Sequence, residues 1–349
     1  MATIKDVAAR SGVSIKTVSR VMNAPASVAA GTRDRVMDAV RTLQFVPDRR
    51  ARAMRSGRSH VVGFLSDSVA TTPFSVDLVR GAQEALAERG MTMLLANADD
   101  GAFADHLRDF QGFRVDGVII ATGFHRPIDN PPPPGTHAVL VNCFAAGSSF
   151  PTVLPDDAQA GRSAAAHLIG LGHRRIAFVT LPSDIAASRL RLDGFRQAHA
   201  DAKLVVDESL IREGIIWVPE GQRMIAFEVA TALLQRPDRP DAIVCGNDIV
   251  AMHVYNAARA CGLSIPGEIS IIGFDDNVVV ATGLMPTLTT VALPYAAMGR
   301  RAVELLLDPR QVLPDNTAWI DCPLVVRQSS AARQAQPWAA GEIRREPEP

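Results

Sequence analysis

The sequence has few of the features that mark membrane, secreted or metal-binding proteins. Its 349 residues contain no run of eighteen apolar residues that could span a bilayer. The first twenty residues carry five charged side chains and no apolar segment, so we expect no secretory signal. The four cysteines lie far apart without a CxxC pair, which predicts buried, reduced thiols, no metal site and a cytoplasmic, nucleoid-associated protein. They are Cys143, Cys245, Cys261 and Cys322.

The sequence also lacks the signatures of the common α/β enzymes. No GxGxxG follows the first strand-like run, and neither a P-loop nor a GxSxG turn occurs. No cysteine–histidine pair and no cluster of a nucleophile with a base can be found. We therefore expect no catalytic residues and no cofactor. An α/β enzyme is kept only as a remote alternative.

Positive charge is concentrated at the N-terminus. Residues 1–60 contain 12 lysines and arginines against 4 acidic residues, a net charge of +8. The remainder contains 24 basic against 33 acidic residues, a net charge of −9. A basic segment joined to an acidic body is typical of a nucleic-acid-binding module fused to another domain. A plain solvated basic face is the alternative explanation.

The N-terminal residues carry the signals of three short helices. Thr3 can cap a first helix, with Asp6 as its capping-box partner. Gly12 supplies a tight turn to a second helix, which Ser14 can cap. A third helix is expected over residues 32–43. Two helices joined by a glycine-containing turn, with a third closing a small core, predict a helix-turn-helix.

The second of these helices has the length and side chains needed to enter a DNA major groove with its N-terminus first. Arg20 can bind O6 and N7 of a guanine, Lys16 can reach a base edge or a phosphate, and Ile15 can contact a thymine methyl group. Hydroxyl side chains suited to phosphate oxygens complete the predicted DNA-binding set. They are Ser14, Thr17 and Ser19.

A second basic segment, VPDRRARAMRSGRS, occupies residues 46–59. Asp48 can cap a short helix that carries four arginines, Arg52 and Arg55 among them. Such a helix is unstable alone, because it is short and its like charges repel, but DNA phosphates would stabilise it. We therefore expect it to be disordered when free and helical on DNA. A basic linker without this role is the alternative.

From residue 61 onward, strand-like apolar runs alternate with amphipathic helical stretches. The runs are VVGFL (61–65), MTMLLA (91–96), DGVIIA (116–121), AVLVNC (138–143), RIAFVT (175–180), AIVCGN (242–247) and ISIIGF (269–274). The helical stretches are 76–89, 157–171, 188–200, 222–235 and 248–261. This alternation predicts parallel sheets covered by helices on both faces. The two groups of strands predict two doubly wound subdomains that face each other across a cleft.

Polar residues stand where several of these runs end, and open α/β sheets bind ligands at the carboxyl ends of their strands. Asn142, Asn247 and Asp275 each close a run. We therefore predict that these three side chains bind a ligand in the cleft. The neighbouring acids Asp248 and Asp276 are better explained as helix caps.

Three further residues are candidates for the same ligand site. Arg191 lies near the start of a helix in SRLRLDGF, and a buried guanidinium needs polar partners. Trp217 and Phe74 lie in predicted loops and could stack on a flat or pyranose ring. An ordinary place in the core is an equally good explanation of Trp217.

The segment ATIKDVAARSGVSIKTVSRVMN resembles the N-terminus of the LacI (lactose-repressor) family of bacterial transcription regulators. Further motifs, among them CGNDIVAM, IIGFDD and LTTVALPYAAMGRRAVELLL, extend the resemblance to about residue 328. It implies an all-α helix-turn-helix head followed by an α/β, periplasmic-binding-protein-like effector domain of two doubly wound parallel-sheet subdomains. It also implies that the chain crosses between the subdomains near residues 160, 290 and 321.

The same resemblance implies roles for single residues. Residues 46–59 match a hinge helix, in which Met54 stands at the position of an apolar wedge for the minor groove, where leucine is more usual. Arg191, Asn247 and Asp275 match positions that hold the effector in the family. Further matches to effector positions are Asp156, Trp217 and Phe74.

These observations predict a homodimeric repressor that binds a palindromic operator and responds to a small-molecule effector, most simply a sugar. The domains are expected at residues 1–45 (helix-turn-helix), 46–59 (hinge), 60–328 (effector binding and dimerisation) and 329–349 (disordered tail). A repressor that depends on a purine corepressor is the alternative within the family. A solute-binding protein is a weaker one, because of the basic N-terminus.

Overall fold

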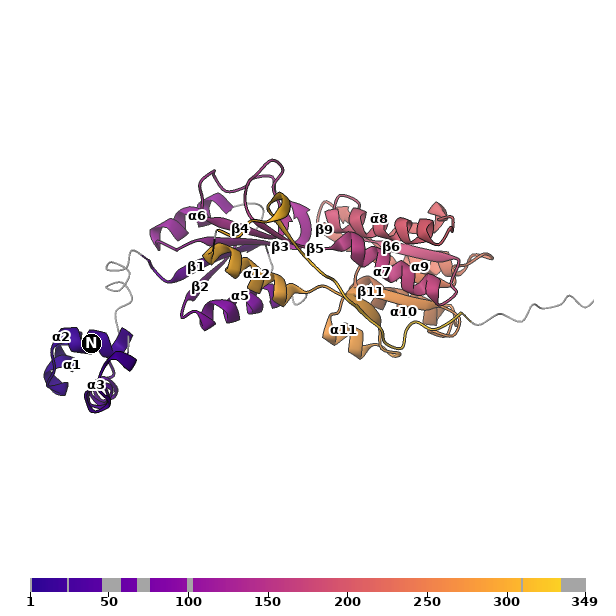
Figure 1. Cartoon of the computed structure of the whole chain (residues 1–349). Helices are drawn as coiled ribbons and strands as arrows, with labels where there is room; N and C mark the ends of the chain where they lie inside the picture. The colour runs from indigo at the N-terminus through magenta and orange to yellow at the C-terminus, as the bar shows by residue number, and fades with distance from the viewer. Residues whose placement is uncertain are drawn as a thin grey trace, which may run out of the picture. The chain divides into compact units, whose positions relative to one another are not determined.

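The computed structural model describes residues 2–23, 25–45, 58–67, 76–98, 103–308 and 310–333. By its internal contacts the chain divides into two units, Met1–His60 and Val61–Pro349 (Figure 1). The hinge predicted at residues 46–59 falls outside the described residues except for its last two positions. Within the described part of the chain, no helix has the length and apolar character that a membrane span requires.

The smaller unit is the predicted helix-turn-helix. Its elements are α1 (Ile4–Ser11), α2 (Ile15–Asn23), the 3-10 turn η1 (Pro25–Ser27) and α3 (Ala30–Thr42). Thr3 and Asp6 form the expected capping box, in which the Thr3 amide donates to the Asp6 carboxylate at 2.7 Å. Gly12 ends α1 with a φ of 68°, and Ser14 Oγ accepts a hydrogen bond from the Thr17 amide at 3.1 Å. These local predictions are confirmed, although α3 begins two residues earlier than expected.

The small unit is held together by a core of short aliphatic side chains from all three helices. Its fully buried members are Val7, Ala8, Val18, Val21, Val36 and Ala39. Helices of this length are marginal in isolation, so their stability comes from this shared core. The core fixes α2 against α1 and α3 and leaves the opposite side of α2 exposed.

The larger unit contains two six-stranded sheets, each with its own helices. The sheet of the first subdomain is wholly parallel, in the order β13-β5-β4-β3-β1-β2. Its strands are β1 (Val61–Asp67), β2 (Thr92–Asn97), β3 (Val118–Pro127), β4 (Ala138–Phe144), β5 (Thr152–Pro155) and β13 (Thr317–Ile320). Helices α5 (Val76–Glu88) and α12 (Tyr295–Leu307) pack on one face, and α6 (Phe103–Gly112) packs on the other. Because both faces are covered, the inner strands are almost continuously apolar.

The sheet of the second subdomain has the order β14-β12-β11-β10-β6-β7, parallel except for β14. Its strands are β6 (Ile176–Thr180), β7 (Ile211–Glu213), β10 (Ala242–Cys245), β11 (Ser270–Asp275), β12 (Thr289–Ala292) and β14 (Leu324–Val325). Helices α7 (Asp157–Gly170) and α8 (Ala186–Asp201) cover one face. Helices α9 (Ala226–Leu234) and α10 (Asp248–Ala260) cover the other, and α11 (Val278–Gly283) follows β11. The fold class predicted from the alternating pattern is therefore confirmed.

The chain passes between the two subdomains three times. It leaves the first sheet after β5 to enter α7, returns after β12 to enter α12, and crosses again from β13 to β14. These crossings lie close to the predicted residues 160, 290 and 321. Because three short segments connect the subdomains, a change in their relative angle requires backbone rotation at only a few residues.

Two glycines allow the close approach of α7 and α8. A Cβ atom on Gly161 would lie 2.0 Å from the carbonyl oxygen of Arg191, and one on Gly194 would lie 1.9 Å from that of Ala158. Neither distance is possible for real atoms, so only glycine fits at these positions. This contact fixes the backbone of α8 at Arg191 against the start of α7.

Two predicted boundaries are wrong. The helix predicted at 222–235 begins only at Ala226, because residues 221–224 form β9 (Gly221–Met224), which pairs antiparallel with β8 (Ile215–Val218). The predicted disordered tail begins too early. Ser329 is fully buried and its carbonyl accepts a hydrogen bond from the amide of Ile271 at 2.9 Å. The chain is ordered against the second sheet as far as residue 333.

Candidate functional site

The outer face of α2 carries the side chains predicted to contact DNA. Lys16 and Arg20 are exposed and form no ion pair with any described residue. Ile15 is 45% exposed on the same helix and is therefore accessible to a base methyl group. The helix contains no acidic residue, so nothing on it repels phosphate. These features suit a helix that enters a DNA groove.

The three hydroxyl residues predicted to contact phosphates are partly engaged within the protein itself. Ser14 accepts from the Thr17 amide, and its hydroxyl lies 2.9 Å from the Thr17 hydroxyl. Ser19 is partly buried. Ser14 and Thr17 therefore first serve the N-terminus of α2, and any phosphate contact has to share these groups. The predicted hinge residues Arg52, Met54 and Arg55 lie outside the described residues.

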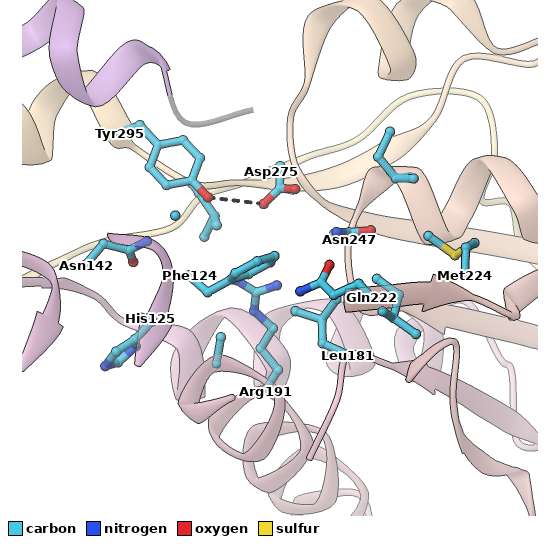
Figure 2. Close-up of a pocket in the computed structure, with 15 residues that line it drawn as sticks. Phe124, His125, Asn142, Leu181, Arg191, Gln222, Met224, Asn247, Asp275 and Tyr295 are labelled. Carbon is cyan, nitrogen blue, oxygen red and sulfur yellow. Dashed lines mark hydrogen bonds between the residues drawn. The ribbon is translucent and has the colours of Figure 1, made fainter. Parts of the chain in front are cut away.

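A cavity of about 360 Å³ lies in the larger unit and is lined from both subdomains (Figure 2). This volume is within the range of small-molecule sites. Four predicted ligand residues line it, namely Asn142, Arg191, Asn247 and Asp275. The lining residues that the sequence did not suggest are Gly123, Phe124, His125, Leu181, Ala187, Ile215, Gln222, Met224, Ile249, Leu293 and Tyr295.

Arg191 is held in one orientation by several partners. Its side chain is almost fully buried, its Nε donates to Asp157 Oδ1 at 2.7 Å, and its Nη1 donates to the carbonyl of Gly246 at 2.6 Å. Its guanidinium carbon lies 4.5 Å from the centre of the Phe274 ring. Burial opposes the charge, but Asp157 and Asp275 raise the pKa of Arg191 above its ordinary value. The remaining amino group, Nη2, donates to no described residue.

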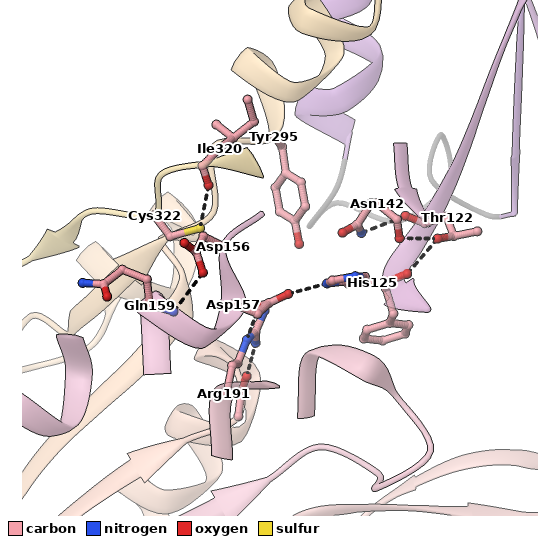
Figure 3. Close-up of polar contacts among 12 residues, drawn as sticks. Thr122, His125, Asn142, Asp156, Asp157, Gln159, Arg191, Tyr295, Ile320 and Cys322 are labelled. Atoms are coloured by element: carbon pink, nitrogen blue, oxygen red, sulfur yellow. Dashed lines mark hydrogen bonds and ion pairs between the residues drawn. The ribbon is translucent and has the colours of Figure 1, made fainter. Parts of the chain in front are cut away.

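A buried hydrogen bond joins the two subdomains beside this arginine (Figure 3). His125, from β3 of the first subdomain, places Nδ1 2.7 Å from Oδ2 of Asp157, the first residue of α7 in the second subdomain. Asp157 is fully buried. Burial alone would raise its pKa, but Arg191 and His125 together hold the pKa of Asp157 below its ordinary value. Asp157 thus connects the first subdomain to the orientation of Arg191.

Asp275 occupies a strained and weakly partnered position at the end of β11. Its φ of 107° is rarely adopted by a residue with a side chain. The nearest hydrogen-bond partner of its carboxylate is the hydroxyl of Tyr295, at 3.5 Å. Burial raises the pKa of Asp275 to about 7, although Arg191 opposes the rise. A half-buried carboxyl with so few partners is suited to accept hydrogen bonds from a ligand.

The two asparagines of the cavity each use one amide atom within the fold. Asn247 Oδ1 accepts from the amide of Val250 at 2.8 Å and caps α10. Asn142, with a φ of 56°, donates from Nδ2 to the carbonyl of Thr122 at 2.9 Å. Asn247 therefore retains its amino group as a donor, and Asn142 retains its oxygen as an acceptor.

The acids predicted to cap helices have other roles. Asp248 lies inside the first turn of α10 and accepts from the Thr290 hydroxyl at 2.6 Å and from the Asn277 amide at 2.8 Å. Asp276 forms an ion pair with Arg327 at 2.6 Å. The caps of α10 and α11 are the asparagines Asn247 and Asn277. The capping prediction for Asp248 and Asp276 is wrong because each cap lies one residue away in the sequence.

Of the predicted ligand residues that the structure describes, two do not line the cavity. Asp156 caps α7, accepting from the amide of Gln159 at 2.9 Å. Trp217 is 52% exposed near the tip of the β8–β9 hairpin, and its indole donates to Asp184 at 2.8 Å. Because Trp217 is paired with the lining residue Gln222, both lie on the same face of the hairpin. Phe74 lies outside the described residues.

Local sequence signals found the lining residues at strand ends but missed His125 and Asp157. These two residues are 32 positions apart, and only the packing of the subdomains brings them together. Elsewhere in the described chain, no group of three or more histidines, cysteines or acids is placed to hold a metal ion.

A helix-turn-helix with an exposed second helix, on the same chain as a two-sheet unit with a ligand-sized cavity, defines a DNA-binding transcription regulator with an effector domain. The chain belongs to the LacI family of bacterial regulatory proteins. The profile "Bacterial regulatory proteins, lacI family" matches residues 3–48, and the profile "Periplasmic binding protein-like domain" matches residues 165–330. The protein is therefore a DNA-binding transcriptional repressor and not an enzyme.

Several characterised proteins are similar over most of the chain. The sucrose operon repressor of Escherichia coli is 36% identical over 338 residues, which cover 95% of this chain and 100% of that protein. The solved complex of the regulator CelR with cellobiose is 30% identical, covers 95% of this chain and 100% of that chain, and has a TM-score of 0.65. A lac repressor dimer bound to operator and anti-inducer has a TM-score of 0.72 over 95% of this chain and 99% of that chain. At 24% identity, this last likeness concerns the fold alone.

Proposed function

We propose that the protein is a homodimeric repressor, acting in the bacterial cytoplasm, whose affinity for a palindromic operator is controlled by a sugar bound in the cleft. The observation that carries this proposal is the cavity itself, in which Arg191 and Asp275 of one subdomain face Asn142 and Tyr295 of the other. A ligand that touches both subdomains has a different affinity for each relative angle of the two. It therefore shifts the equilibrium between these angles.

The chemistry of the lining supports a sugar. The asparagines offer one donor and one acceptor, and Asp275 offers a carboxylate, which together suit ring hydroxyls. Phe124 and Met224 supply apolar surface for the C–H faces of a ring. Relatives named for sucrose and cellobiose agree with this class. The exposed tryptophan of the hairpin, Trp217, would be an additional stacking residue if the hairpin closed over the ligand.

The buried contact between His125 and Asp157 suggests how the ligand site is coupled to the angle of the subdomains. Opening the cleft would separate His125 from Asp157 and so change the environment of the carboxylate that orients Arg191. A ligand that needs Arg191 in its present orientation would favour the closed cleft. The connecting segments would transmit this preference to the DNA-binding heads through residues 46–59.

The test combines operator binding with a ligand screen. DNase I footprinting of the DNA upstream of the protein's own gene should reveal a palindromic site. Gel shifts on that site with sucrose, cellobiose, ribose and purine bases should show that a sugar changes the affinity. A change caused only by a purine would support the corepressor alternative, and no change with any compound would contradict the proposal.

Arg191→Lys is the variant that isolates the ligand site, with Arg189→Lys as its control on the exposed side of the same helix. Lysine keeps the positive charge beside Asp157 but cannot form the planar fork. Alanine is less suitable, because losing one partner of a buried pair costs about 3–5 kcal/mol. Arg191→Lys should bind the operator normally and lose the response to the sugar, whereas Arg189→Lys should keep both.

A further inference from the structure

The guanidinium of the cavity already has acidic partners before any ligand binds. Arg191 is the only arginine or lysine among the described residues that line it. Asp157 pairs with its Nε, and the half-buried Asp275 lies close enough to raise the pKa of Arg191 further. The imidazole of His125, another lining residue, already places its Nδ1 against the Asp157 carboxylate. Two carboxyl groups thus face one guanidinium and one imidazole.

Among the described residues near the cavity, the other basic side chains are paired or turned away from it. Arg126, which follows the lining residue His125, pairs with Asp67 at 2.5 Å. On β9, Arg223 lies between the lining residues Gln222 and Met224. Its side chain is therefore on the opposite face of the hairpin from theirs. The N-terminus of α10 is capped by Asn247 and is followed by the buried acid Asp248.

We infer that the ligand of this cleft is an uncharged polyhydroxyl compound, without a phosphate or carboxylate group. The inference rests on the proposed function and specifies the class of its effector. A phosphate ester carries up to two negative charges, and burying an unpaired charge is strongly unfavourable. Sites for such groups use arginine clusters or helix N-termini whose amides are available. Here Asp157 and Asp275 flank the guanidinium, and Asp275 in its ionised form would repel an anion.

The same groups favour hydroxyl donors. The Asp275 carboxyl and the free oxygen of Asn142 accept hydrogen bonds, while Arg191 Nη2 and the amino group of Asn247 donate them. A sugar hydroxyl both donates and accepts, so it can bridge an acceptor and a donor of this set. Such a ligand replaces lost water contacts without introducing a charge.

Matched pairs of ligands test the inference by calorimetry on the full chain. The pairs are sucrose and sucrose 6-phosphate, glucose and glucose 6-phosphate, and ribose and ribose 5-phosphate. In each pair that binds, the uncharged sugar should bind at least about tenfold more tightly than its ester. An ester that binds as tightly as its sugar, or more tightly, overturns the inference.

A second measurement does not require the natural ligand. Thermal unfolding is compared in inorganic phosphate and in chloride of equal ionic strength. Phosphate also binds the basic head and stabilises folded proteins in general, so the wild type and the exposed α8 variant Asp193→Asn define the baseline stabilisation. Asp275→Asn should gain stabilisation above this baseline, because Arg191 is then opposed by one carboxylate only. Stabilisation of the wild type by phosphate that Asp275→Asn does not increase would contradict the inference.

The two proposals fail in different ways. If a neutral sugar binds but leaves operator affinity unchanged, the proposed function is wrong and the charge argument stands. If a sugar phosphate binds more tightly than its sugar and changes operator affinity, the regulatory function stands and the inference is wrong.

Discussion

At the scale of single residues, the two sites use opposite electrostatic environments. Lys16 and Arg20 on α2 are exposed and unpaired among the described residues, so their charges are available to DNA phosphates and bases. Arg191 is buried and its charge is taken up by Asp157 and Asp275. The first arrangement favours a polyanion, and the second favours a neutral ligand.

Asp275 should give the protein a characteristic dependence of stability on pH. Because its folded-state pKa of about 7 lies above the ordinary value of an aspartate, its contribution to stability is full at low pH. That contribution is lost as the pH rises from about 4 through 7. Relative to Asp275→Asn, the wild type should therefore lose free energy of unfolding between pH 5 and pH 8. Urea unfolding of both proteins across this range measures the effect. Parallel pH profiles would show that the Asp275 carboxyl titrates normally.

Arg20 should determine sequence preference. Arg20→Ala should cost about 1–3 kcal/mol on the operator and relax the preference at one position in each half-site. Arg10→Ala, an exposed change at the end of α1, is the control that removes the same charge from the head. Binding measured on the operator, on single-base variants and on random DNA separates the two effects. An equal loss on operator and random DNA would make Arg20 a phosphate contact.

At the scale of elements, the contact between α7 and α8 positions the ligand site. Gly161→Ala would press a methyl group against the carbonyl oxygen of Arg191. It should lower the free energy of unfolding by about 1–3 kcal/mol and weaken sugar binding, because Arg191 is displaced. Gly170→Ala in the same helix meets no atom within 4 Å and should instead stabilise by up to about 1 kcal/mol. Urea unfolding measures the stability of both variants. An equal change in their free energies of unfolding would contradict the packing argument.

The elements also show what the sequence could and could not predict. The cap formed by Thr3 with Asp6 and the turn at Gly12 depend on neighbouring residues and are confirmed, whereas the caps of α10 and α11 lie one residue from the predicted acids. The positions of Asn247 and Asp275 at the cavity could also be predicted, because each residue ends an apolar run in the sequence. The β8–β9 hairpin was mistaken for the start of a helix, because GQRMIAFE has no turn signal where the strand ends. The pair His125 and Asp157 depends on how two sheets pack, which no local pattern encodes.

At the scale of the whole molecule, a basic DNA-binding head is joined to an acidic regulatory body. Residues 1–60 have a net charge of +8 and the rest a net charge of −9. If the dimer neutralises about eight phosphates, the slope of log K against log salt should be about −7. Gel shifts on the operator between low and moderate salt give this slope. A slope shallower than about −3 would contradict a binding mode dominated by the head.

The central claim, that a sugar in the cleft and the operator control each other's binding, is tested most directly by measuring both affinities in both directions. The sugar that binds in the screen is titrated calorimetrically into the free protein and into the protein–operator complex, and the operator is titrated with and without the sugar. Linkage requires the two affinities to change by the same factor, which we expect to be about 5–150-fold. In Arg191→Lys both factors should fall to one while operator affinity is kept. Equal sugar affinity for the free and the operator-bound wild type would contradict the account.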